Sequence, residues 1–95
     1  MIRPRRQPAA WSPVVPAIAS LRAHAEEIRS AELARLDGRL AKDERDVVDT
    51  LTAQIVNKLL HLPTVRLKEA AVTADGLLYA DVVRHLFGLE EEDGA

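Results

Sequence analysis

The sequence has 95 residues, enough for one small domain, and its aliphatic content with a single Trp, Tyr and Phe favours helices packed on helices. A formal net charge of −2 gives no global attraction for nucleic acid, and the absence of cysteine excludes disulfides, thiolate nucleophiles and cysteine metal sites. No apolar run is long enough to span a bilayer and no signal-peptide pattern is present, so the expected location is the cytoplasm.

Residues 1–13 are predicted to form an irregular arm rich in proline and arginine. Pro4, Pro8 and Pro13 each fix φ and disfavour helix at the residue before them. Trp11 lies within this arm, and we expect its ring to pack back on the edge of the domain. The basic start of the arm and the acidic tail at 90–95 are both predicted to be solvated termini.

The first helix is predicted to begin at Pro16, where the missing N–H costs nothing. Apolar residues then recur at spacings of three and four, in the order Ile18, Leu21, Ala25 and Ile28, and after a skip in the register continue with Leu33, Leu36 and Leu40. Arg22 and Glu26 are four residues apart, so an ion pair is expected between them. Gly38 weakens the last turn, and the helix is predicted to end between Leu36 and Ala41.

The second helix is predicted to begin at Asp43 as its cap, with Glu44 and Asp46 adding negative charge to the first turn. Its apolar positions cover more than half of its circumference and comprise Val47, Val48, Leu51, Ile55, Val56, Leu59, Leu60 and Leu62. Pro63 is predicted to stop this helix.

Two shorter helices are predicted to follow, the third at about Thr64–Thr73 and the fourth at Leu77–Phe87, separated by the turn residues Asp75 and Gly76. No segment alternates with a period of two, so no sheet is expected. The predicted fold is therefore an all-α bundle of two long antiparallel helices and two short ones, a helical dimerisation domain at 14–89.

The width of the apolar surface on the second helix predicts self-association. One hairpin partner covers only part of such a surface, and a two-fold homodimer would bury the remainder. The residues expected in the dimer interface or the adjoining core are Ile18, Leu21, Ile28, Leu33, Leu51, Ile55, Leu59 and Leu60. Periodicity alone does not separate the interface from the core.

No pattern of catalytic residues is found in the sequence. His24, His61 and His85 have no metal-ligand spacing, and neither a dinucleotide fingerprint nor a phosphate-binding loop is present. Asp81 and His85 are four residues apart, a pair expected to stabilise a helix rather than to transfer protons. We therefore predict no catalytic, cofactor-binding or metal-binding residue in this chain.

One long segment carries a resemblance to a known family. The run Leu51-Thr52-Ala53-Gln54-Ile55-Val56-Asn57-Lys58-Leu59-Leu60-His61-Leu62-Pro63-Thr64 resembles the C-terminal dimerisation domain of glutamyl-tRNA reductase. The segment from Val15 to Leu33 and the ending Leu86-Phe87-Gly88-Leu89 are also similar to that domain, so that the resemblance covers about Trp11 to Leu89.

The resemblance implies a role in a larger enzyme. The family's full enzyme reduces glutamyl-tRNA with NADPH to glutamate-1-semialdehyde in tetrapyrrole synthesis, using a cysteine nucleophile and a nucleotide-binding domain. Its implied partners are a second copy, tRNA(Glu) and glutamate-1-semialdehyde aminotransferase. Because this chain has no cysteine and no nucleotide fingerprint, it is expected to be non-catalytic on its own and to bind no cofactor.

Two alternatives from other classes remain. A tRNA-contacting accessory domain would use the three arginines of the N-terminal arm, Arg3, Arg5 and Arg6, together with Lys58 and Arg66. A small enzyme with a histidine site would bind a metal ion.

Overall fold

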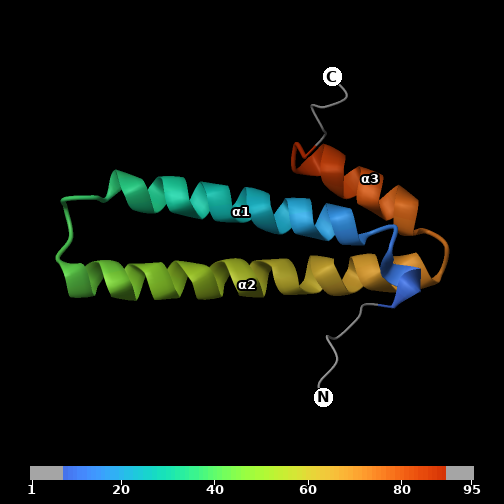
Figure 1. Ribbon diagram of the computed structural model, residues 1–95, viewed down its shortest axis with the longest axis horizontal. Helices are drawn as coiled ribbons and strands as arrows, with labels where there is room; N and C mark the ends of the chain where they lie inside the picture. Colours follow the sequence, from blue (N-terminus) through green and yellow to red (C-terminus); the bar gives the residue numbers. More distant parts are fainter. Residues whose placement is uncertain (1–7, 90–95) are drawn as a thin grey trace, which may run out of the picture.

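The computed structural model describes residues 8–89, which form a short 3-10 turn, η1 (Ala9–Trp11), and three α-helices, α1 (Val15–Arg35), α2 (Lys42–Val72) and α3 (Gly76–Leu86). No strand occurs in this range, which confirms the predicted all-α class. α1 and α2 lie side by side as an antiparallel hairpin, and α3 packs beside the N-terminal half of α1 (Figure 1). None of the helices in the described range is long and apolar enough to cross a membrane.

Two of the predicted segments, the N-terminal arm and the acidic tail, lie partly or wholly outside the described residues. The acidic tail at 90–95 lies outside them, as does most of the N-terminal arm, including Arg3, Arg5 and Arg6. Within the remaining part of the arm, Trp11 packs against the core, as expected from the sequence. The ammonium group of Lys68 lies 4.2 Å from the centre of the Trp11 ring, a cation–π contact that joins η1 to α2.

The first helix begins and ends close to its predicted positions. α1 starts one residue before Pro16, which occupies the first turn, where its missing N–H has no helical partner to lose. It ends at Arg35, and Leu36 donates its N–H to the carbonyl of Leu33 at 3.0 Å. Gly38 follows in the turn with a φ of +82°, a backbone conformation that glycine adopts without strain.

The prediction that Asp43 caps the second helix is wrong. α2 begins at Lys42 with Ala41 as its N-cap residue, so Asp43 lies inside the first turn. The carboxylate of Glu44 accepts the Ala41 N–H at 2.8 Å, because a glutamate three residues after the cap is long enough to reach back to it. The expected negative charge of the first turn is retained by Asp43 and Glu44.

The prediction that Pro63 stops the second helix is also wrong. α2 continues through Pro63 to Val72, so the predicted third helix is its C-terminal part and the described range has three α-helices instead of four. Leu60, Leu67 and Ala70 are buried on both sides of the proline, and this packing holds the helix together. The hydroxyl of Thr64 also donates to the Leu60 carbonyl at 2.7 Å.

The core is small and lies at one end of the molecule. It is built around a buried cluster of Val14, Ala17, Leu67 and Ala80, where η1, α1, α2 and α3 meet. Within the described range the only other buried apolar side chains are Leu21, Leu60 and Ala70. Beyond α3 the hairpin has two helices facing each other, and no third element of the described residues covers them (Figure 1).

Candidate functional site

The uncovered half of the hairpin contains an open apolar groove. It runs between α1 and α2 and has a volume of about 370 Å³. Its lining is mainly aliphatic and consists of Ala25, Ile28, Arg29, Glu32, Leu33, Leu36, Val48, Thr52, Ile55, Val56 and Leu59. An apolar groove of this kind on a small domain is a typical binding surface.

A continuous apolar stripe runs along α2 and shares two side chains, Ile55 and Leu59, with the lining of this groove. We call Val47, Leu51, Ile55, Leu59 and Leu62 the α2 stripe. Their spacings of four, four, four and three place them on one side of the helix. Each exposes between 47% and 68% of its surface, whereas exposed helix faces are ordinarily polar.

A second apolar surface lies on α3. We call Leu78, Tyr79, Val82 and Leu86 the α3 outer face, since Ala80 and Val83 are directed into the core from the other side of the helix. All four of these side chains expose more than two-fifths of their surface. α3 is thus apolar on both its inner and its outer side.

The eight residues predicted for the interface or adjoining core divide into two groups. Leu21 and Leu60 are buried within the chain's own core, and Ile18 packs against the core cluster. The other five belong to the open surface, with Leu33 half-buried in the groove and Ile28, Leu51, Ile55 and Leu59 exposed. The prediction did not include Val47, Leu62 or the α3 outer face, although the first two continue the spacing of Leu51 and Leu59.

A polar crosslink joins the two helices at the edge of the groove. Arg29 on α1 forms hydrogen-bonded ion pairs with Glu26 at 2.8 Å and with Asp49 on α2, and it also donates to the Thr52 hydroxyl at 3.2 Å. The hydrogen bond from Arg29 lowers the pKa of Glu26, and the two carboxylates raise the pKa of Arg29. The arginine is therefore held as a fixed cation between α1 and α2.

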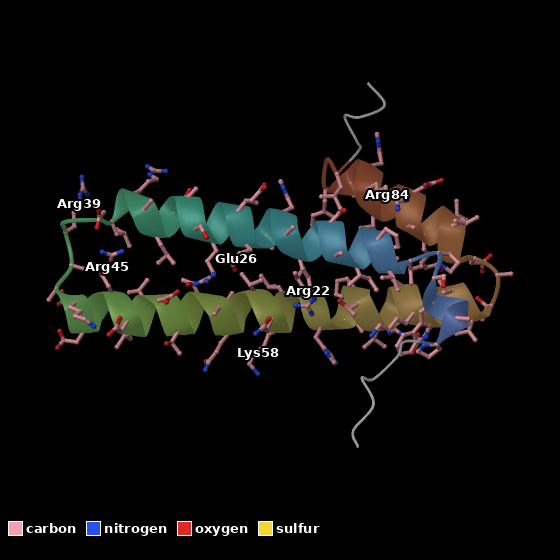
Figure 2. All side chains as sticks on the ribbon, in the orientation of Figure 1. Arg22, Glu26, Arg39, Arg45, Lys58 and Arg84 are labelled. Atoms are coloured by element: carbon pink, nitrogen blue, oxygen red, sulfur yellow. The ribbon has the colours of Figure 1, made fainter. Side chains whose placement is uncertain are left out.

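The predicted ion pair between Arg22 and Glu26 is wrong, because both side chains are engaged elsewhere. Glu26 pairs with Arg29, and Arg22 donates to the Asn57 side chain across the hairpin at 3.4 Å. Figure 2 shows Arg22 and Glu26 lying between the two helices, whereas Lys58 points away from α1.

A second, charged hollow of about 610 Å³ lies near the turn between α1 and α2. Its three aspartates are all engaged in ion pairs: Asp37 with Arg45 at 2.8 Å, Asp46 with Lys42 at 3.4 Å, and Asp49 with Arg29. This hollow is therefore a solvated set of internal pairs and does not suggest a ligand. Among the residues that the structure describes, no group of three His, Asp or Glu side chains is placed to hold a metal ion.

The fold and its open surfaces define a small all-α interaction domain. The family model of the glutamyl-tRNA reductase dimerisation domain matches residues 11–89, and the chain belongs to this family, which confirms the resemblance found in the sequence. Known proteins support this assignment. A glutamyl-tRNA reductase of Chloroflexus aurantiacus is 47% identical over 79 residues, covering 80% of this chain and 18% of that protein.

Two further relatives give the same result. The glutamyl-tRNA reductase of Desulforudis audaxviator is 40% identical over 85 residues, which cover 85% of this chain and 19% of the relative. That of Streptomyces avermitilis is 40% identical over 82 residues, covering 83% of this chain and 14% of the relative. The chain thus spans less than a fifth of the length of these relatives. No solved structure matches the chain.

Proposed function

We propose that this chain is a non-catalytic homodimerisation domain that joins two copies through the α2 stripe and the groove beside it. The observation that carries this proposal is the α2 stripe itself, five large aliphatic side chains in one row, each about half exposed or more. Membership of a dimerisation-domain family supports the same conclusion.

The energetic argument follows from the exposure of these side chains. Completing the burial of an aliphatic side chain that is half exposed stabilises an assembly by about 1 kcal/mol. In a two-fold dimer each contact occurs twice, so a stripe of this length contributes on both copies. Residues 8–89 of the same chain offer no comparable gain, because α3 reaches only the other half of the hairpin (Figure 1).

The biological role that we propose follows from the relatives. Dimerisation would serve glutamyl-tRNA reductase, which the family resemblance describes as a cytoplasmic, NADPH-dependent enzyme of tetrapyrrole synthesis. NADPH, tRNA(Glu) and the aminotransferase that consumes glutamate-1-semialdehyde would then be bound by other domains of such an enzyme. This chain would supply the two-fold axis and no reacting group.

Sedimentation across a concentration series tests the dimer. The wild-type chain should sediment as a dimer, and Ile55→Glu should sediment as a monomer that retains its helical circular dichroism, because a buried charge opposes association. Asn57→Glu is the matched control, since it adds the same charge at an exposed position on the opposite side of α2 from Ile55, outside the stripe and the groove lining. A wild-type chain that remains monomeric at high concentration would contradict the proposal.

The alternative role in tRNA contact receives little support from the described cations. Arg66 is already paired with Glu69 at 3.2 Å. Lys58 lies about two helical turns before Arg66 on α2, so the two cations do not form one cluster. Phosphate contacts would make binding strongly salt-dependent. A tight, salt-sensitive affinity of the isolated chain for tRNA would favour this alternative over a purely structural role.

A further inference from the structure

The open groove is a continuation of the surface on which α3 already packs. On α1, Ala17 belongs to the core cluster that receives Ala80 of α3. Leu21 and Ile28 follow Ala17 by four and eleven residues, spacings that keep all three on one side of the helix. Leu21 is buried, but Ile28 is exposed and lines the groove. The same side of α1 is therefore covered at its N-terminal end and bare further along.

The uncovered length matches one further helix of the size of α3. At a rise of about 1.5 Å per residue, the 11 residues of α3 extend about 16 Å and the 21 residues of α1 about 31 Å. α3 lies along the N-terminal half of α1 (Figure 1), so the open half has room for one more helix of equal length. The open half of α1 thus has about the length of α3.

The α3 outer face has the complementary shape and chemistry. It is a convex row of aliphatic and aromatic side chains, in which Leu78, Val82 and Leu86 follow one another at intervals of four. The groove is concave and mainly aliphatic. Neither surface has a partner within the described part of the chain, and the two lie toward opposite ends of the hairpin (Figure 1).

We propose that in the dimer the α3 outer face of each copy docks in the open groove of the other copy. A second copy turned end for end by a two-fold axis places its α3 over the bare half of the first hairpin. The same rotation places the first copy's α3 over the bare half of the second hairpin. This inference rests on the proposed homodimer and specifies which surfaces meet in it.

The extent of the contact supports this arrangement over one through the groove alone. A stable interface engages about 20–30 residues on each side. The groove has eleven lining residues, too few by themselves. With the α3 outer face and the remaining members of the α2 stripe, the surface approaches the required extent. The reciprocal arrangement closes the α3 outer face and the groove at once, and with the groove it covers Ile55 and Leu59 of the α2 stripe.

Crosslinking tests the arrangement directly, since the chain contains no native cysteine. Ile55→Cys, carrying an affinity tag, and Val82→Cys, without one, are mixed, allowed to exchange subunits and oxidised. The expected product is a tagged–untagged heterodimer formed in preference to either homodimeric crosslink. Asn57→Cys replaces Ile55→Cys in the control, because Asn57 is exposed on the opposite side of α2 from Ile55 and does not line the groove, and it should not crosslink to Val82→Cys.

The outcomes separate this inference from the proposed function. A sample that sediments as a dimer but yields no crosslink between positions 55 and 82 overturns the α3 arrangement and leaves the homodimer standing. A sample that sediments as a monomer overturns both. A heterodimeric crosslink that disappears in the Asn57→Cys control supports both.

Two adjacent leucines of α3 supply an independent test. Leu78 is 62% exposed and lies on the α3 outer face, whereas Leu77 is 68% exposed and lies on another side of the helix. Leu78→Glu should raise the dimer dissociation constant at least about tenfold, and Leu77→Glu should change it by no more than about twofold. Equal effects, with helical circular dichroism unchanged in both variants, would overturn the arrangement.

Discussion

Arg29 on α1 donates hydrogen bonds to both the carboxylate and the main-chain carbonyl of Asp49 on α2, the latter at 3.1 Å. This pair joins the two helices in the half of the hairpin that has no core of its own. The Arg29 side chain is only 15% exposed, although most of the charged side chains around it are exposed. A polar crosslink thus aligns the helices where apolar burial is weakest, and it lies at the edge of the groove.

Replacing Arg29 should therefore destabilise the hairpin more than replacing an ordinary surface arginine. A lysine at position 29 has a single ammonium group and cannot reach Glu26, Asp49 and Thr52 together. We expect Arg29→Lys to lower the thermal midpoint. Arg35→Lys, at a side chain that is 76% exposed and pairs only with Glu32, should leave the midpoint nearly unchanged. Equal midpoints for the two variants would show that Arg29 does not crosslink the hairpin in solution.

The pKa of Glu26 predicts how this crosslink responds to acid. The hydrogen bond from Arg29 lowers the pKa of Glu26 below its ordinary value of 4.5 in the folded chain. As the pH falls, the unfolded chain binds this proton first, so the contribution of Glu26 to stability is complete at neutral pH. It is lost progressively below pH 4.5, as the pH falls through the folded pKa.

Urea unfolding of wild type and Glu26→Gln at neutral and acid pH measures this contribution. The difference in unfolding free energy between the two proteins should shrink on acidification. In an Arg29→Met background, Glu26→Gln should produce no such pH-dependent difference, because the hydrogen bond that lowers the pKa is gone. A difference that stays constant with pH would contradict the assignment.

The sequence predicted the helical class and most helix boundaries because the signals are local. Pro16 at a helix start, Gly38 in a turn and the Asp75–Gly76 break each act through the backbone of their own neighbourhood. The predicted helix end at Pro63 was wrong because the prediction also relied on a local signal alone. The cost of an interior proline is local, whereas the burial of Leu60 and Leu67 that offsets it depends on helices distant in sequence.

The candidate surface was predictable in kind but not residue by residue. An apolar position at helical spacing is buried either by its own chain or by another, and the spacing is the same in both cases. Leu59 and Leu60 are adjacent and equally apolar, yet the first is exposed and the second is buried. The α3 outer face was not predicted as a surface, because a short helix that is apolar on two sides resembles a core helix in sequence.

The interior proline provides a stability prediction. Pro63→Ala should raise the free energy of unfolding by about 1–2 kcal/mol, because alanine restores the missing hydrogen bond to the Leu59 carbonyl. Part of the gain is offset by the greater freedom of the unfolded chain. Chemical denaturation of the monomer measures the change. A loss of stability would instead mean that the core around Leu67 depends on the proline.

Truncation of a core leucine should cost folding stability, whereas truncation of a surface leucine should affect dimerisation instead. Leu67 is 1% exposed, and Leu67→Ala should lower the free energy of unfolding by about 2–5 kcal/mol through the lost burial and the cavity it leaves. Leu59→Ala should change the unfolding of the monomer by less than about 0.5 kcal/mol, since that side chain is exposed. It should nevertheless weaken dimerisation in sedimentation experiments. Comparable unfolding costs for the two variants would contradict the separation of core from surface.

Gly76, the first residue of α3, lies close against Ala71 of α2, and the sign of the stability change on Gly76→Ala tests this contact. A Cβ atom at this position would lie 2.8 Å from the Ala71 Cα and 3.2 Å from the Ala71 Cβ, so the backbone of α2 or α3 would have to move. At an unhindered helical position, Gly→Ala stabilises by up to about 1 kcal/mol. Here we expect Gly76→Ala to destabilise by about 1–3 kcal/mol.

The neighbouring exposed residue supplies the control for this last prediction. Asp75→Ala alters the same turn without placing an atom against α2, so its effect measures the turn alone. Because Gly76→Ala displaces the start of α3, it should also weaken dimerisation if the α3 outer face docks on a second copy. Unfolding and sedimentation measured on one preparation would separate the two effects. A stabilised Gly76→Ala variant would show that α3 does not pack against Ala71 as closely as described.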